Sequence, residues 1–158
     1  MREDTGKSVF TPAEIEYLRG ERLCRIATVG PGGQPHVTPV TFHYNAEEDS
    51  IDVGGLFWGQ TKKWRDAHRN PKVTVLVDDV IPNPRRARAI EIRGTAELHE
   101  TGGEGANPRF PNFAPQFFRI RPTRIVAWGI EEGGAGAEGF QVNARSVGSA
   151  GGAEPGPG

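Results

Sequence analysis

The sequence has a single cysteine, Cys24, and only 35% hydrophobic residues in a length of 158. One cysteine excludes an intrachain disulfide framework, and it cannot form a zinc site by itself. No apolar run approaches the length of a membrane span, and residues 1–8 are too polar for a secretory signal. We therefore expect a cytoplasmic protein in which Cys24 is a small buried hydrophobe.

A strong charge of either sign is also absent. The chain has 19 basic and 20 acidic residues, which gives a formal net charge of −1. Without a global field to attract them, neither nucleic acid nor an anionic membrane is an expected partner. The four histidines lack the spacing of metal ligands, so no metal site is predicted.

Glycine and proline, by contrast, are abundant, with 22 and 13 residues. The length predicts one domain, and this composition favours a compact core with flexible additions. We expect a disordered N-terminus over residues 1–8 and a folded domain over residues 9–130. Residues 131–158 are expected to be a Gly-rich flexible tail.

The first predicted element is a short helix with strong terminal signals. Thr11 is the predicted N-cap, Pro12 occupies the first helical position, and Glu14 completes a capping box. Gly20 is the predicted end of the helix.

Most of the remaining chain alternates as β-strands do. The predicted strands span residues 23–29, 35–44, 51–57, 72–79, 89–98 and 117–130. The near-continuous valines of the fourth indicate a buried central strand. Pro122 marks a break or an edge in the last. Residues 80–88, which carry three arginines, and residues 99–116 are expected to be loops. Six or so strands with little helix predict an antiparallel barrel or sandwich.

Two features indicate a ligand site. Thr61 is a good N-cap for a second helix, yet Lys62 and Lys63 occupy its first turn, where the helix dipole disfavours cations. A phosphate bound at this helix start would reverse the penalty. In addition, Pro35 and Pro39 leave one strand edge without a full hydrogen-bond ladder. That edge is either an ordinary sheet edge or backbone left open beside a ligand.

Five segments, in this order, resemble the split β-barrel flavin-binding superfamily named after pyridoxamine 5′-phosphate oxidase. They are Ile26-Ala27-Thr28-Val29, Gly33-Gln34-Pro35-His36-Val37, Thr61-Lys62-Lys63 with Asn70-Pro71-Lys72-Val73, Glu91-Ile92-Arg93-Gly94-Thr95-Ala96 and Pro122-Thr123-Arg124-Ile125-Val126-Ala127-Trp128-Gly129. The resemblance implies a mainly β fold, an antiparallel, Greek-key-like split β-barrel of the FMN-binding type with a few short helices.

Two phrases are most similar to the actinobacterial branch that uses the deazaflavin coenzyme F420. They are Pro35-His36-Val37-Thr38-Pro39-Val40 and the Thr-Lys-Lys at residues 61–63. The resemblance implies an oxidoreductase that transfers a hydride between reduced F420 and an unsaturated small-molecule substrate. The alternatives are an FMN-dependent oxidase or reductase, and a non-catalytic flavin- or haem-binding protein.

The resemblance also implies which residues contact the cofactor. They are Thr38, Pro39, Val40, Thr41, Gly55, Leu56, Phe57, Thr61, Lys62 and Lys63. Residues 38–41 would line the ring, residues 55–57 would close the ring pocket, and residues 61–63 would hold the phosphate. Alternatively, the two lysines are solvated side chains at the end of a helix and bind no ligand. No catalytic residue is assigned.

The same resemblance implies a homodimer with two cofactor sites at its interface. A modest apolar content and the open edge at Pro35 and Pro39 favour such an assembly. Since Lys62 and Lys63 oppose the helix dipole, we expect that replacing both weakens cofactor binding and leaves the fold intact.

Overall fold

The computed structural model describes residues 7–131 and 141–148. Within them the chain forms two α-helices, three 3-10 turns and eight strands. The helices are α1 (Pro12–Gly20) and α2 (Lys62–Arg69), and the 3-10 turns are η1 (Pro31–Gly33), η2 (Trp58–Gln60) and η3 (Gly103–Gly105). The strands are β1 (Leu23–Val29), β2 (Pro35–Thr41), β3 (His43–Asn45), β4 (Ser50–Gly54), β5 (Lys72–Pro82), β6 (Arg85–His99), β7 (Phe117–Trp128) and β8 (Val142–Ser146).

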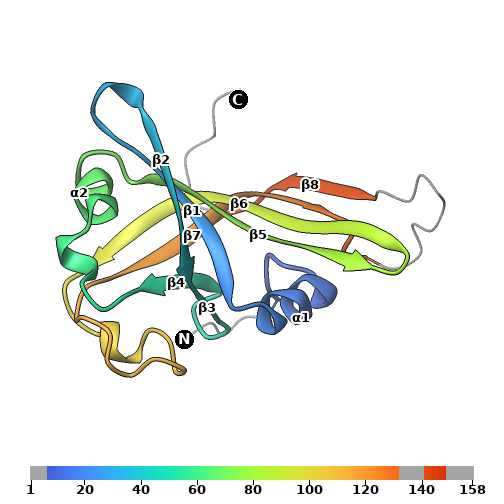
Figure 1. The fold of residues 1–158 in the computed structure, drawn as a ribbon, viewed down its shortest axis with the longest axis horizontal. Coiled ribbons are helices and arrows are strands. Elements are labelled where there is room, and N and C mark those ends of the chain that lie inside the picture. Colours follow the sequence, from blue (N-terminus) through green and yellow to red (C-terminus); the bar gives the residue numbers. More distant parts are fainter. Residues whose placement is uncertain (1–6, 132–140, 149–158) are drawn as a thin grey trace.

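All eight strands belong to one antiparallel sheet in the order β2-β1-β5-β6-β7-β4-β3, with β8 paired to β7. The sheet is strongly curled, and β2 at one end approaches β4 near the other (Figure 1). In Figure 1, α2 lies at one end of the sheet and α1 beside the opposite side of the curl. The predicted split β-barrel is confirmed.

The core is built from alternate residues of the strands. Val73, Val75 and Val77 of β5 are buried, and β5 lies between β1 and β6, so the predicted central valine strand is confirmed. Cys24 is also buried in this core, and burial raises the pKa of its thiol to about 12. A thiol with so high a pKa stays protonated at neutral pH and behaves as a hydrophobe.

Helix α1 has the predicted ends. The Thr11 side chain accepts from the Glu14 backbone N–H at 3.1 Å, and the Glu14 carboxylate accepts from the Thr11 N–H at 3.0 Å. Pro12 is the first helical residue and Gly20 the last. The sequence was sufficient to predict the start of this helix, because each capping contact is made within the first turn.

The predicted loop over residues 80–88 is wrong. Strand β5 runs on to Pro82, β6 begins at Arg85, and the two remain paired to the end of the hairpin. Asn83 and Pro84 form the connecting turn. The side chains at the end of the hairpin are exposed, so the strands pair there without an alternation of apolar and polar residues. The hydrophobic pattern therefore could not reveal the extension.

The flexible tail predicted over residues 131–158 is wrong for residues 142–146, which form β8. This strand pairs with β7 from Trp128↔Val142 to Arg124↔Ser146. The N-terminal prediction for residues 1–8 is also wrong at Ser8, whose hydroxyl donates to Asp49 at 2.5 Å. Residues 1–6, 132–140 and 149–158 lie outside the described part of the chain.

Other strands also differ from the sequence prediction. The strand expected over residues 35–44 is interrupted at Phe42, which separates β2 from β3, and the one expected over residues 51–57 ends at Gly54. Pro122 lies inside the continuous strand β7, opposite Gly94, where the register with β6 shifts. A Cβ at Gly94 would lie 2.3 Å from the Arg121 carbonyl oxygen. The proline therefore marks a bulge that only glycine can oppose.

The described part of the chain contains no helix that is both long and apolar enough to cross a membrane.

Candidate functional site

A cavity of about 600 Å³ opens where the ends of β2 and β4 meet the segment that leads into α2. The fourth side is formed by the loop between β6 and β7. The residues that line it are Val40, Thr41, Gly54, Gly55, Leu56, Phe57, Trp58, Thr61, Lys63, Arg109, Phe110, Pro111, Asn112 and Phe113. A volume of this size is typical of a small-molecule site.

Most of the residues predicted to contact a cofactor lie around this cavity. The ones that line it are Val40, Thr41, Gly55, Leu56, Phe57, Thr61 and Lys63. Thr38, Pro39 and Lys62 are absent from the lining. Thr38 and Pro39 lie on β2, at the edge of the sheet, opposite Ile26 and Arg25 of β1.

Lys62 has a partner within the protein. Its ammonium lies 2.9 and 2.8 Å from the two carboxylate oxygens of Asp66, one turn along α2. Asp66 is 1% exposed, and its carboxylate also accepts from the Thr28 hydroxyl at 2.9 Å. Burial alone would raise the pKa of Asp66, but the hydrogen bonds from Lys62 and Thr28 bring it below its ordinary value.

The ion pair with Asp66 explains why a lysine is tolerated in the first turn of α2. It also removes the reason for expecting no loss of stability when both lysines are replaced, because Asp66 would lose its charged partner. Spacing at i, i+4 was visible in the sequence, but the burial of Asp66 was not.

Lys63 is different, because its ammonium faces an aromatic ring and no carboxylate. The nitrogen lies 5.3 Å from the centroid of Trp58. The side chain is half-buried, and burial lowers the pKa of its ammonium. Thr61 caps α2 by accepting from the Trp64 N–H at 3.2 Å, and its hydroxyl donates to the Trp58 carbonyl at 2.7 Å. Lys63 is therefore fixed at the cavity wall as a partly desolvated cation.

The fourth wall, residues 109–113, was not predicted as part of the site. Phe110 and Phe113 stack with ring centroids 5.3 Å apart and planes inclined by 7°. Two phenylalanines three residues apart in a Gly-, Pro- and Asn-rich segment were the available signal. The position of that segment beside the cavity depends on long-range packing, which cannot be read from the sequence alone.

The loop is held in place by hydrogen bonds to the sheet. The buried Asn107 side-chain amide donates to the Phe42 carbonyl at 3.2 Å, and the Ala114 N–H donates to the Gly55 carbonyl at 2.9 Å. Phe113 lies 3.4 Å from the position of a Cβ on Gly54. Residues 109–113 are thus a wall anchored on both sides.

All charged residues of the cavity lining are positive. Lys63 and Arg109 are its cations, and it contains no carboxylate. Neither residue takes part in an ion pair within the described residues, whereas Lys62, Arg88 and Arg121, for example, do. An apolar, aromatic cavity with two unpaired cations suits a flat ligand that carries negative charge.

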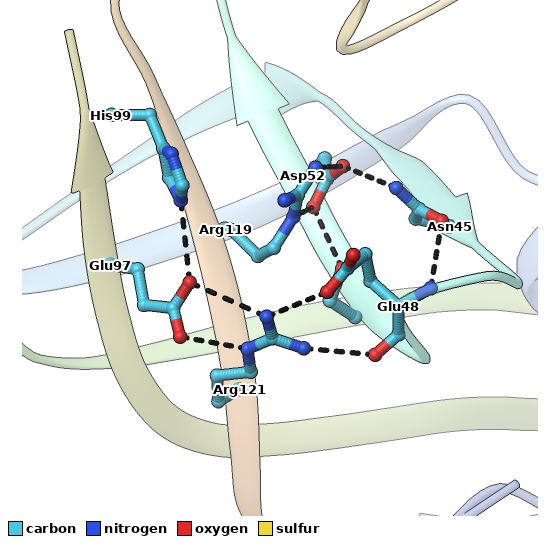
Figure 2. Close-up of polar contacts among 8 residues, drawn as sticks. Asn45, Glu48, Asp52, Glu97, His99, Arg119 and Arg121 are labelled. Carbon is cyan, nitrogen blue, oxygen red and sulfur yellow. Dashed lines mark hydrogen bonds and ion pairs between the residues drawn. The ribbon is translucent and has the colours of Figure 1, made fainter. Parts of the chain in front are cut away.

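A second polar cluster lies on β4, β6, β7 and the turn between β3 and β4 (Figure 2), and none of its residues lines the cavity. The Arg121 guanidinium lies between Glu48 and Glu97, 2.8 and 2.9 Å from their carboxylates, and Arg119 pairs with buried Asp52 at 3.2 Å. The hydrogen bond from Arg121 lowers the pKa of Glu48. Each charge in this cluster has a partner, which is typical of a structural network.

The arginines of the β5–β6 hairpin do not approach the cavity. Arg88 pairs with Asp79 at 2.7 Å, and Asp79 also accepts from the Tyr17 hydroxyl at 2.8 Å. Within residues 7–131 and 141–148, no group of three His, Cys, Asp or Glu side chains is arranged to hold a metal ion.

A curled antiparallel sheet with a lysine-bearing helix start beside an aromatic cavity defines a split β-barrel of the flavin-binding type. Residues 10–129 match the pyridoxamine 5′-phosphate oxidase family. The chain belongs to this family.

Among its relatives is the 5a,11a-dehydrotetracycline/5a,11a-dehydrooxytetracycline reductase of Streptomyces rimosus. The two are 43% identical over 123 residues, which cover 77% of this chain and 84% of the reductase.

Two solved structures share the fold. A conserved hypothetical protein of Mycobacterium tuberculosis is 20% identical, with a TM-score of 0.61 and coverage of 95% of this chain and 99% of that one. A haem binding protein of Mycobacterium smegmatis is 13% identical, with a TM-score of 0.62 and coverage of 87% of this chain. This chain spans 59% of the length of that protein.

Proposed function

We propose that the protein is an oxidoreductase that transfers a hydride between reduced coenzyme F420 and an unsaturated small molecule. The relative from Streptomyces rimosus, at 43% identity, is named as a reductase of a dehydrogenated ring system, and this supports the oxidoreductase class. The observation that carries the cofactor assignment is the half-buried Lys63, which has no ion pair in the described residues, at a cavity whose lining contains no carboxylate.

The residues present fit a flavin-like group with an anionic tail. The half-buried Lys63 supplies a charge-assisted hydrogen bond for a phosphate, and Thr61 holds the start of α2 in place. Val40, Gly55 and Leu56 offer a narrow, apolar surface for a ring. When bound, the deazaflavin supplies the hydride chemistry, and the protein binds, orients and excludes water.

FMN is the second candidate, because flavin-binding and haem-binding proteins share the fold. A solved FAD binding protein of Mycobacterium smegmatis, 19% identical with a TM-score of 0.54 and coverage of 75% of this chain and 93% of that one, is of this kind. F420 is favoured because a long tail with several negative charges gains more than the compact phosphate of FMN does from a cavity that offers Lys63 and contains no carboxylate.

Parallel titrations of F420, FMN and haem, followed by absorbance, test the assignment. F420 should bind more tightly than FMN, and the preference should shrink at high salt because exposed charge pairs are screened. Oxygen should be a poor acceptor for the reduced complex. Tighter binding of FMN at both salt concentrations would place the protein with the flavin oxidases, and binding of haem alone would make it a carrier.

The second proposal is a homodimer formed through the open side of the sheet. Strand β2 is an edge of the sheet, and its Val37 is 62% exposed. A hollow on the same surface is lined by Val37, Ala27, Leu76 and Trp128, with Arg25 and Glu91 of opposite charge. An apolar surface with both charges is suited to self-association about a two-fold axis.

Light scattering should therefore give about twice the chain mass of 17.1 kDa. Val37→Glu should shift the protein to a monomer, since it places charges in an apolar contact. Val142→Glu, at an equally exposed valine on β8, is the matched control and should leave the mass unchanged. A monomeric wild type that still binds F420 would contradict the proposal.

A further inference from the structure

Three exposed apolar side chains lie together at the cavity. Of the seven large hydrophobic residues that the described part exposes, Leu56, Phe57 and Phe110 all line it, with exposures of 60, 68 and 37%. Aromatic and aliphatic groups exposed together around a hollow mark a binding surface. Leu56 and Phe57 come from the turn after β4, whereas Phe110 comes from the opposite loop.

The cavity thus has two dissimilar sides. The side formed by β2, β4 and the start of α2 carries Lys63 and includes the residues proposed for the cofactor. The other side consists of residues 109–113 and carries Arg109 and the stacked pair Phe110–Phe113. A hydride transfer needs the donor and acceptor atoms in contact, so the side that the cofactor leaves free is the side that receives the acceptor.

We propose that residues 109–113 are the substrate-binding wall, with Phe110 stacking on the substrate and Arg109 pairing with its negative charge. This inference rests on the proposed function, because it assigns the opposite side to the cofactor. The substrate class that fits is a flat, fused-ring organic anion, such as a polycyclic phenolate or enolate.

The shape of the wall supports a fused ring system. The Phe110 and Phe113 planes are nearly parallel, and Phe110 lines the cavity and is still 37% exposed, so the pair can be extended by a third aromatic ring. Hydrogen bonds from Asn107 and Ala114 hold the segment on either side. A wall that is already ordered binds a rigid planar ligand at little entropic cost.

The charge of the wall supports an anion. The Arg109 backbone N–H donates to the Asn107 side chain at 3.1 Å, which fixes the loop beneath the residue, and the guanidinium takes part in no ion pair of the described residues. The pKa of neighbouring His43 is lowered, chiefly by burial and further by the charges of Arg109 and Arg19, although Asp52 opposes them. Arg109 itself remains a cation at the cavity wall without an ion pair in the described residues, so it is available to a ligand anion.

Calorimetric titration of the full-length protein without cofactor tests the proposal. The probe is anthraquinone-2-sulfonate, with neutral 2-(hydroxymethyl)anthraquinone and single-ring benzenesulfonate as comparisons. The fused anion should bind most tightly. Phe110→Ala should weaken both anthraquinones about five- to ten-fold, as the loss of aromatic stacking predicts. Arg109→Gln should weaken the sulfonate about ten-fold and leave the neutral compound unchanged.

Val80→Ala, at an exposed valine of the β5–β6 hairpin, is the matched control and should bind the probe as the wild type does. F420 affinity is measured on the same variants. Phe110→Ala should bind F420 normally, and an equal loss of F420 and probe would overturn the assignment of this wall to substrate. Equal probe binding by Phe110→Ala and wild type would also overturn it, whether or not F420 binds. Probe binding that depends on Phe110, in a protein that binds neither F420 nor FMN, would support the wall and refute the proposed function.

Discussion

Lys63→Ala should weaken F420 binding ten-fold or more and lower the free energy of unfolding by no more than about 1 kcal/mol, through loss of the contact with Trp58. The ammonium of Lys63 is half-buried at the cavity wall and has no carboxylate partner in the described residues, so its charge is available to a ligand phosphate. Loss of a hydrogen bond to a charged group costs about 1.5–3 kcal/mol. Fluorescence titration of F420 measures the affinity, and urea unfolding measures the stability.

Lys62→Ala is the matched variant and should behave in the opposite way. It leaves buried Asp66 without its cation, and we expect the free energy of unfolding to fall by roughly 1–2 kcal/mol, a figure reduced because Lys62 itself is 42% exposed. F420 affinity should change less than in Lys63→Ala. Equal F420 affinities for wild type and Lys63→Ala would refute the assignment of Lys63 to the cofactor phosphate.

The pH dependence of the Lys62→Ala effect provides a separate check. The folded-state pKa of Asp66 lies below the ordinary value of 3.8, so the ion pair contributes its full stability above that pH. The contribution is lost as the pH falls through the folded-state value. The difference between wild type and Lys62→Ala should therefore be largest near neutrality and should shrink in acid. Asp66→Asn should abolish the difference at every pH.

Arg145→Met should lower the free energy of unfolding by about 3–5 kcal/mol, because it removes the partner of a buried carboxylate. The Arg145 guanidinium lies 2.6 and 3.0 Å from the two oxygens of Glu14, and it also donates to the Val9 carbonyl at 2.8 Å. Glu14 is fully buried in α1. Urea unfolding measures the loss, and hydrogen exchange should show faster exchange in β8.

The control for this variant is Arg124→Met, since the Arg124 side chain donates only to Ser146 at 3.3 Å in the described structure. Its stability should remain within about 0.5 kcal/mol of wild type. In the background of Glu14→Gln, which preserves the capping box, the cost of Arg145→Met should become much smaller. An Arg145→Met protein as stable as wild type would show that β8 contributes little to the fold.

Local patterns in the sequence determined much of the sheet. Strand β1 and helix α1 have the bounds expected from alternation and capping, because the residues that decide them are neighbours along the chain. The buried central position of β5 followed from its valines, since a strand covered on both faces is apolar throughout. The ordered set of segments also identified the split barrel.

The parts of the sheet that the sequence did not predict depend on interactions between distant residues. Strand β8 lacks an apolar pattern, and it is held by pairing with β7 and by the contact of Arg145 with Glu14, 131 residues away. The β5–β6 hairpin extends beyond its apolar part because backbone pairing continues where side chains are exposed.

The site divides in the same way. Seven of the predicted residues line one cavity, because β2, the turn after β4 and the start of α2 are family features visible in the sequence. Only the tertiary structure distinguished Lys62 from Lys63, since one carboxylate buried beneath Lys62 makes it an internal partner. Only packing brought residues 109–113 to the opposite wall, because that position depends on contacts with Phe42 and Gly55, more than fifty residues earlier in the chain.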